Sequence, residues 1–240
     1  MNIRPYININ GVSSQSIQGL LISSLPPISK PPIRTNIEEV DGKDGDLVTV
    51  LGYGAYDKPV NIGLTYDYDI DAIIKYFDSN GVVTFSNEPD KYYRFAIYEA
   101  IDFERLINFK TAEVIFHCQP FKFSLQERVK EFSISENPAT LSIFNAGNVY
   151  SRPVISITGS GTVIFSLNGN AILNIELGDT PQTIIIDCER FNAYNSTRTV
   201  LLNRLVTGNY DNIKIEKGAN TIGLTGNVSA FTIDKFSRWI

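Results

Sequence analysis

The chain has 240 residues and a mass of 26.8 kDa, which fits two domains of ordinary size. Its 21 Lys and Arg against 26 Asp and Glu give a formal net charge of −5, which argues against a protein that works by gripping phosphate groups. The single histidine excludes metal sites that need two, and two cysteines are too few for a Cys-rich zinc site or a disulfide scaffold.

The first half of the sequence predicts several strands and a proline-rich connection. Prolines cannot donate to a strand ladder, so the pairs Pro26-Pro27 and Pro31-Pro32 make residues 24–34 an edge or an extended connection. A turn cluster follows at 41–45. Alternating apolar patterns predict strands at residues 6–10, 17–25, 47–51, 59–66, 82–85, 92–99 and 111–118.

One helix is predicted in this half. Asp69 can serve as the N-cap, apolar side chains recur at helical spacing over 70–78, and Asn80-Gly81 ends the pattern. Acidic residues at a helix N-terminus complement the helix dipole. The same acids form an Asp-x-Asp-x-Asp pattern, but the Gly and Glu that complete a calcium loop are missing, so no metal site is predicted.

The second half has the pattern of a β-sandwich. Residues 119–138 contain Pro120, mixed charges and Asn137-Pro138, and the boundary between a domain 1–130 and a domain 131–240 is placed there. Beyond it, short strands alternate with Gly and Asn turns about every 8–12 residues. The clearest hairpin joins 162–167 to 170–175 through Asn168-Gly169, and further strands are predicted at 183–187, 200–202, 221–224 and 230–233.

Charge is unevenly divided between the two halves. Residues 1–129 hold 12 Lys and Arg against 17 Asp and Glu, a net of −5, whereas residues 130–240 hold 9 of each. We therefore expect the two domains to face different neighbours.

Candidate catalytic groups are few. His117 and Cys118 are adjacent in a predicted strand, so their side chains point to opposite faces and cannot act as a pair. Acidic pairs such as Glu38 and Asp44 have the composition of a glycosidase site, but they lie in a turn-rich stretch where solvated acids are the default. Gly159-Ser160-Gly161 is interpreted as a turn at a strand end, and both cysteines are expected to be reduced and buried. No catalytic, cofactor-binding or metal-binding residue is assigned.

No apolar run approaches the roughly 20 residues of a membrane-spanning helix, and the N-terminus lacks a signal-peptide core. We expect a soluble protein that is made in the cytoplasm and does not insert into a membrane.

The ordered set of motifs resembles one known family, the distal tail proteins of bacteriophages with long non-contractile tails. The motifs extend over nearly the whole chain. They are Asn10-Gly11, Gly42-Lys43-Asp44-Gly45, the helix at 70–78, residues 88–93, 109–120, 145–147 and 153–159, the Asn168-Gly169 hairpin, and residues 185–189 and 218–222. Two departures are the turn at 41–43, which often reads Pro-Gly-Arg in the family, and the segment 208–211, which lacks the family's proline.

The resemblance implies a mainly β structural virion protein without enzymatic activity. Such proteins form a homo-hexameric ring at the virion tail tip, assembled in the host cytoplasm. The N-terminal domain is expected to be a ring-forming β-barrel or β-sandwich. The ring that these domains build stacks on the tail tube protein, and a tail-associated lysin or fibre hub docks below. DNA passes through without specific binding. The C-terminal domain is expected to be a galectin-like or carbohydrate-module-like sandwich that can hold receptor-binding proteins, and Gly42, Lys43, Asp44 and Gly45 are candidate interface residues.

Two expectations refine this picture. Proline-punctuated residues 24–46 are candidate arms for reaching a neighbouring subunit, and Asp and Glu of residues 1–129 should outnumber Lys and Arg on the channel wall. Two rival functions remain open from the residues alone. One is a β-sandwich adhesin that recognises host-surface carbohydrate, and the other is a small glycan hydrolase that uses two carboxylates.

Overall fold

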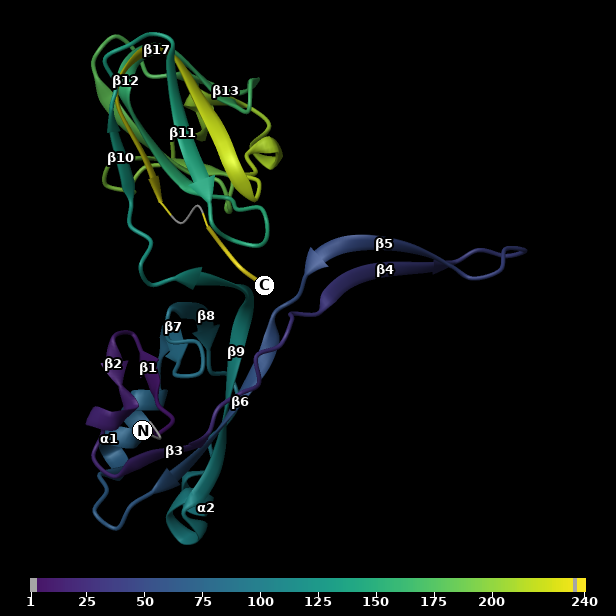
Figure 1. Ribbon diagram of the computed structural model, residues 1–240, viewed down its shortest axis with the longest axis vertical. Coiled ribbons are helices and arrows are strands. Elements are labelled where there is room, and N and C mark those ends of the chain that lie inside the picture. Colours follow the sequence, from purple (N-terminus) through teal and green to yellow (C-terminus); the bar gives the residue numbers. More distant parts are fainter. Residues whose placement is uncertain (1–3, 235–236) are drawn as a thin grey trace. The chain divides into compact units, whose positions relative to one another are not determined.

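The computed structural model describes residues 4–234 and 237–240 (Figure 1). Met1–Ile3, the first residues of the segment in which the sequence shows no signal-peptide core, lie outside the described part. The chain divides into two compact units, one that runs to Leu125 and includes Ile240, and one that spans Gln126–Trp239. Each unit has a hydrophobic core of its own, and the mainly β architecture predicted from the sequence is confirmed.

The N-terminal unit contains a seven-stranded antiparallel sheet in the order β2-β1-β7-β8-β9-β6-β3. One face of this sheet is apolar and packs against helix side chains such as Phe77, whose ring centroid lies 6.4 Å from that of Phe116. The strands are β1 (Ile7–Ile9), β2 (Val12–Ser13), β3 (Leu20–Ser24), β6 (Tyr56–Leu64), β7 (Asn80–Phe85), β8 (Lys91–Ala96) and β9 (Thr111–Ser124).

Among the described residues of this unit, two α-helices accompany the sheet. In α1 (Ile70–Phe77) the predicted cap is confirmed, because the Asp69 carboxylate accepts a hydrogen bond of 3.0 Å from the backbone N–H of Ala72. The second helix, α2 (Phe103–Phe109), was not predicted. It spans only seven residues and buries only Leu106, so its apolar pattern is too short to show a helical period.

The strand predicted at 111–118 was expected to stop before Pro120, and this is wrong, since β9 continues to Ser124. β8 pairs with β9 on both sides of Pro120, but the register shifts between Tyr93 and Phe95. Pro120 falls within this irregular stretch, where no ladder partner requires the N–H that proline lacks.

A second, two-stranded sheet belongs to the same unit. β4 (Ile33–Glu39) and β5 (Asp46–Tyr53) pair with each other, and Figure 1 shows them running out from the seven-stranded sheet. We call residues 33–53 the arm and residues 26–32 the root of the arm. The root is the predicted proline-rich connection, which ends slightly earlier than expected because β4 begins at Ile33.

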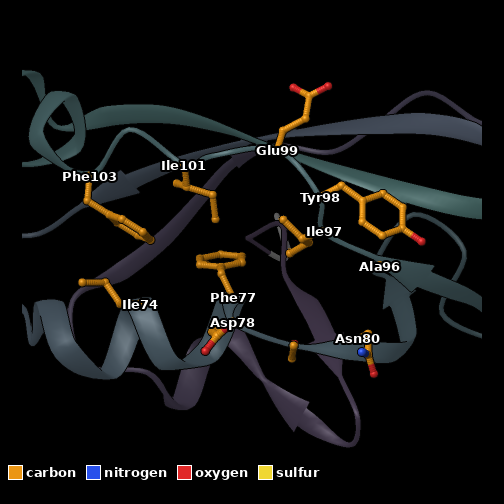
Figure 2. A pocket seen from close by; sticks show the side chains of 11 residues that line it. Ile74, Phe77, Asp78, Asn80, Ala96, Ile97, Tyr98, Glu99, Ile101 and Phe103 are labelled. Atoms are coloured by element: carbon orange, nitrogen blue, oxygen red, sulfur yellow. The ribbon is translucent and has the colours of Figure 1, made fainter.

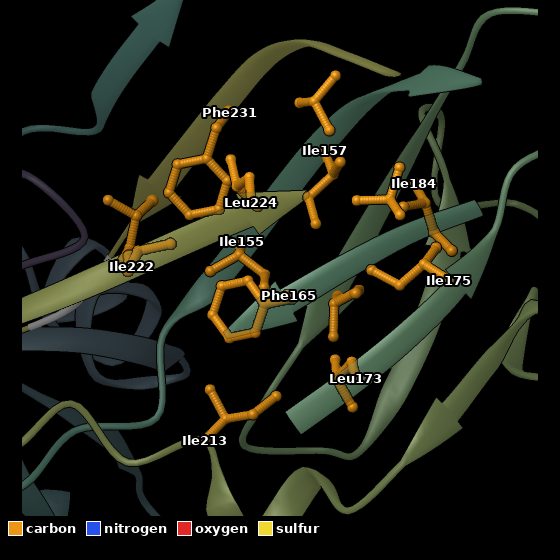
Figure 3. Close-up of a cluster of buried hydrophobic side chains, with 14 of the residues drawn as sticks. Ile155, Ile157, Phe165, Leu173, Ile175, Ile184, Ile213, Ile222, Leu224 and Phe231 are labelled. Atoms are coloured by element: carbon orange, nitrogen blue, oxygen red, sulfur yellow. The ribbon is translucent and has the colours of Figure 1, made fainter. Parts of the chain in front are cut away.

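The C-terminal unit is a β-sandwich in which two long strands serve both layers. The first half of β12 pairs with the end of β17 and, on its other side, with β14. The second half of β12 pairs with the beginning of β17 and with β13, and β11 pairs with that same beginning of β17. Aromatic and aliphatic side chains fill the space between the layers (Figure 3). The strands are β10 (Lys130–Ser133), β11 (Ala139–Asn145), β12 (Val154–Leu167), β13 (Asn170–Glu176), β14 (Gln182–Asp187), β15 (Asn192–Asn195), β16 (Val206–Gly208) and β17 (Gly218–Asp234).

Asn168 and Gly169 have φ angles of 51° and 83°, as the predicted hairpin turn requires. Two other expectations are wrong. Gly159-Ser160-Gly161 does not end a strand but bends β12 as it passes from one layer to the other, with a register shift against β17. Residues 200–202 form only an isolated bridge, between Leu201 and Tyr194. Short 3-10 helices lie at Ser14–Ser16, Asn203–Leu205 and Tyr210–Asn212.

Candidate functional site: an exposed amphipathic arm

The arm has one apolar face. Ile37 is paired with Val48, and Thr35 with Val50, so these side chains project from the same side of the two-stranded sheet. The exposed fractions of Ile37, Val48 and Val50 are 57%, 54% and 67%. The opposite face is more polar, with the pair Asn36 and Thr49, but it also carries Leu47, which is paired with Glu38 and 46% exposed.

Nothing in the described part of the chain covers this apolar face, because β4 and β5 pair only with each other and every residue of β4 is exposed. An isolated two-stranded hairpin is at best marginally stable in water. Apolar surface left uncovered on one chain commonly marks a contact with another. The arm therefore has the character of an element that becomes covered in an assembly.

The predicted interface residues Gly42, Lys43, Asp44 and Gly45 all lie at the tip of the arm. Gly42 and Gly45 adopt φ angles of 80° and 77°, and a Cβ atom at either position would meet nothing within 4 Å. Glycine at the tip thus serves the turn conformation rather than a close approach to another segment.

The tip is strongly acidic. Residues 38–46 contain five acids and a single basic residue, Lys43, for a net charge of −4. This segment therefore carries four of the five units of net negative charge of residues 1–129. Glu38 and Asp44, the acids considered for glycan hydrolysis, are exposed on this projecting arm. Two hydrolytic carboxylates must flank a substrate in a cleft, and the arm forms none among the described residues.

The root of the arm is attached to the seven-stranded sheet by side-chain donors. Three of its carbonyl groups accept hydrogen bonds from side chains that come later in the sequence. A fourth accepts from a backbone N–H, and this bond closes the base of the arm. These contacts are Asn87 Nδ2 to Pro26 O (2.9 Å), Lys58 Nζ to Pro27 O (3.3 Å), Tyr56 Oη to Ser29 O (3.5 Å) and Gly54 N to Pro32 O (2.8 Å).

His117 and Cys118 lie on opposite faces of β9, as predicted. His117 is partly exposed and its Nδ1 lies 2.8 Å from Oδ1 of Asp57 on the neighbouring strand. Cys118 is fully buried, and burial raises the pKa of its thiol to about 12. A thiol with so high a pKa is a poor nucleophile at neutral pH. Cys188 is likewise buried and free.

A hollow of about 400 Å³ opens beside the end of α1 (Figure 2). The rings of Phe77 and Phe103 and the side chains of Ile97 and Ile101 point into it, whereas Glu99 points away. The lining also includes Asp78, Ser79 and Asn80, but the Ser79 hydroxyl donates to the carbonyl oxygen of Tyr76 over 3.2 Å rather than to a base, so it is not arranged as an activated nucleophile. No group of three His, Cys, Asp or Glu residues placed to hold a metal occurs in the described ranges 4–234 and 237–240. Over the same ranges, no helix combines the length and apolarity that crossing a membrane would need.

The C-terminal unit presents an outward sheet face almost without charge. It spans β11, β17, β12, β13 and β16, and its residues follow from the strand registers and their exposure. They are Thr140, Ser142, Phe144, Ala219, Thr221, Gly223, Thr225, Thr162, Ile164, Ser166, Asn174, Glu176 and Thr207, of which Glu176 alone is charged. This face is consistent with the zero net charge of residues 130–240.

No known family model matches the chain, and no curated protein sequence matches it. Among solved structures, it is similar to the Dit protein (gp 19.1) of phage SPP1, described as a paradigm of the hub adsorption apparatus of phages that infect Gram-positive bacteria. The TM-score is 0.67, the identity is 16%, and 95% of this chain and 97% of that chain are covered.

Chains of the phage P2 baseplate in its activated conformation, with Ca and with Sr, give TM-scores of 0.49 each. Their identities are 12% and 13%, and 96% of this chain is covered in both comparisons. At 16% identity, the likeness to SPP1 Dit concerns the fold. Both units of this chain therefore follow, over nearly their full length, the fold of a phage hub protein.

Proposed function

We propose that the protein is a structural component of a phage virion, the distal tail hub. In this proposal six copies form a ring that joins the tail tube to the host-adsorption apparatus at the tail tip. The fold shared with SPP1 Dit over 95% of the chain supports this function. The observation that carries it is the arm, whose apolar face is left uncovered by the residues that the structure describes.

A ring of identical subunits needs contacts between two different patches on each subunit. The arm supplies one such patch, since it can be covered by the next copy while the body of the subunit is covered by the arm of the previous one. The exposed Ile37, Val48 and Val50 would then become buried, which stabilises an assembly in proportion to the apolar area removed from water.

The partners follow from this placement. The tail tube protein stacks on one side of the ring, and a tail-associated lysin or fibre hub docks on the other. The weakly charged outward sheet face of the C-terminal unit is the surface offered to receptor-binding proteins. The ring assembles in the host cytoplasm, lets DNA pass, and binds neither cofactor nor membrane.

The acidic balance of residues 1–129 fits a channel that DNA traverses without sticking, because a negative wall repels phosphates. Four of the five excess charges gather at the arm tip, so the channel-wall hypothesis depends on where the tips lie in the ring. A ring structure with a basic lumen would contradict it.

Light scattering tests the oligomer. A stable particle of six times 26.8 kDa supports the ring. A species that remains a monomer even when mixed with its tail tube partner would contradict it.

A second function is favoured by the weakly charged outward face of the C-terminal unit, whose exposed hydroxyl and amide side chains and Phe144 suit an uncharged glycan. In that case the protein would be a carbohydrate-binding adhesin. A monomer that binds purified host cell-wall glycan, and loses binding when Phe144 is changed to Ala, would favour the adhesin. Hydrolysis of the glycan is not expected, and a double Glu38→Gln and Asp44→Asn variant should behave as the wild type in a hydrolysis assay.

A further inference from the structure

A lysine occupies a position on the buried face of β6 where the strand pattern calls for an apolar residue. Lys58 alternates with the core residues Val60 and Ile62, and it is only 2% exposed. Lysine is almost never buried without a partner, because removing its charge from water costs free energy.

Three aromatic rings surround the amine of Lys58. Its Nζ lies 4.8 Å from the ring centroid of Tyr93, 4.9 Å from that of Tyr56 and 6.0 Å from that of Phe85. These distances are within the range of cation–π attraction. The rings thus form a cage that holds the amine in one place.

The cage is itself fixed by a charged pair. The Tyr93 hydroxyl donates to the Glu88 carboxylate over 2.5 Å, and Lys122 forms an ion pair with the same carboxylate. Glu88 therefore has Lys122 as its ion-pair partner. Desolvation lowers the pKa of Lys58, and the nearby Cys118 and Glu88 oppose this effect.

Within the described residues, the hydrogen-bond acceptor of Lys58 is the carbonyl oxygen of Pro27, 3.3 Å away in the root of the arm. The adjacent carbonyl of Pro26 accepts from Asn87 over 2.9 Å. Two consecutive carbonyls are therefore held by donors from two different segments of the body. Proline fixes φ at each of these positions, so the direction in which the chain leaves the sheet is constrained.

We propose that Lys58 is a positioning residue, which uses its aromatic cage and the Pro27 carbonyl to fix the direction of the arm relative to the seven-stranded sheet. Its importance for assembly rests on the proposed function, in which the arm reaches a neighbouring copy. The positioning itself does not depend on that function and can be measured on a single subunit.

Spin labels on the arm and on the body test the positioning. The double variant Asn36→Cys and Asn108→Cys places one label on the polar face of the arm and one on α2, both at exposed positions, while the native cysteines are buried. Labelled protein is diluted with unlabelled protein so that labels on different subunits do not interact, and the distribution of distances between the labels is recorded. The same distribution is measured after Lys58→Met and, separately, after Asn87→Ala.

We expect a narrow distribution in the parent and a distribution about twofold wider in Lys58→Met. Asn87→Ala removes the neighbouring clamp and should widen it as well. Lys110→Met is the matched control, because Lys110 also lies over a ring, that of Tyr68 at 4.8 Å, but contacts no residue of the root. It should leave the distribution narrow.

An unchanged distribution in both folded Lys58→Met and folded Asn87→Ala would overturn the positioning role, and so would a parent distribution that is already broad. If Lys58→Met fails to fold, Asn87→Ala decides between the outcomes. A wider distribution in Lys58→Met with ring assembly intact would support the positioning and instead count against the use of the arm in assembly.

Discussion

Phe165 and Phe231 lie at the centre of the C-terminal sandwich, both fully buried, with ring centroids 6.4 Å apart and planes inclined by 24° (Figure 3). Phe165→Ala would leave a cavity that rigid sheets on either side cannot close, and we expect a loss of about 3–5 kcal/mol in the unfolding free energy of this unit. Chemical denaturation measures it. Phe144→Ala is the matched control, since Phe144 is 61% exposed. Equal effects of the two substitutions would contradict the assignment of the core.

Glu127 makes the stability of the C-terminal unit depend on pH. Burial raises the pKa of its carboxyl group, although the Ser237 N–H donates to it over 3.1 Å. A raised folded-state pKa favours the protonated form. The group's contribution to stability is therefore complete below its unfolded pKa of about 4.3 and is lost as the pH rises through the folded pKa.

Glu127→Gln keeps an acceptor for Ser237 but removes the buried charge. We expect the variant to be more stable than the wild type at pH 7 and equal to it near pH 4, as measured by denaturation at each pH. Glu131→Gln, at an exposed position on β10, should show no such crossover. A wild type that is the more stable protein at pH 7 would contradict the role of burial.

Among the elements of the fold, β5 allows the two faces of the arm to be compared by changing two adjacent residues. Val48 and Thr49 are neighbours whose side chains project from opposite faces of the arm. Val48→Glu places a charge on the apolar face and should lower the mass of the assembled protein in light scattering, because the charge would be buried against the neighbouring copy. Thr49→Glu should assemble normally. Assembly that is insensitive to Val48→Glu, or equally sensitive to both changes, would rule out the apolar face as the contact.

Elements whose specification is local could be predicted from the sequence. Asp69 caps α1 through its own side chain, and Asn168-Gly169 supplies the positive φ angles of its hairpin. Elements that depend on distant partners could not. Pro120 is accommodated inside β9 by a register shift against β8, and Gly159–Gly161 bends β12 between two layers.

The same distinction applies to the candidate site. The turn chemistry of Gly42 and Gly45 indicated the arm tip, and the prolines indicated an extended root. The alternation of residues 33–39 and 46–53 does not show whether a strand pair joins a larger sheet. The role of Lys58 could not be found from the sequence either, because its carbonyl partner and its cage come from segments far apart in the chain.

At the scale of the whole molecule, the two cores contain no residue in common. We propose that each unit folds on its own, and we expect a fragment of residues 126–240 to unfold cooperatively. Circular dichroism during heating measures this transition, and Phe165→Ala should lower its midpoint in the fragment as it does in the full chain. An unfolded fragment would show that the C-terminal unit depends on the rest of the chain.

The central claim is that the arm of each subunit is covered by the next subunit of a six-membered ring. Electron microscopy of the purified protein, alone or bound to its tail tube partner, tests this claim most directly. We expect six subunits around a central channel, with Ile37, Val48 and Val50 of each arm packed against the adjacent copy. A ring of six in which the apolar face of the arm stays in solvent, or particles without a ring even with the partner present, would contradict it.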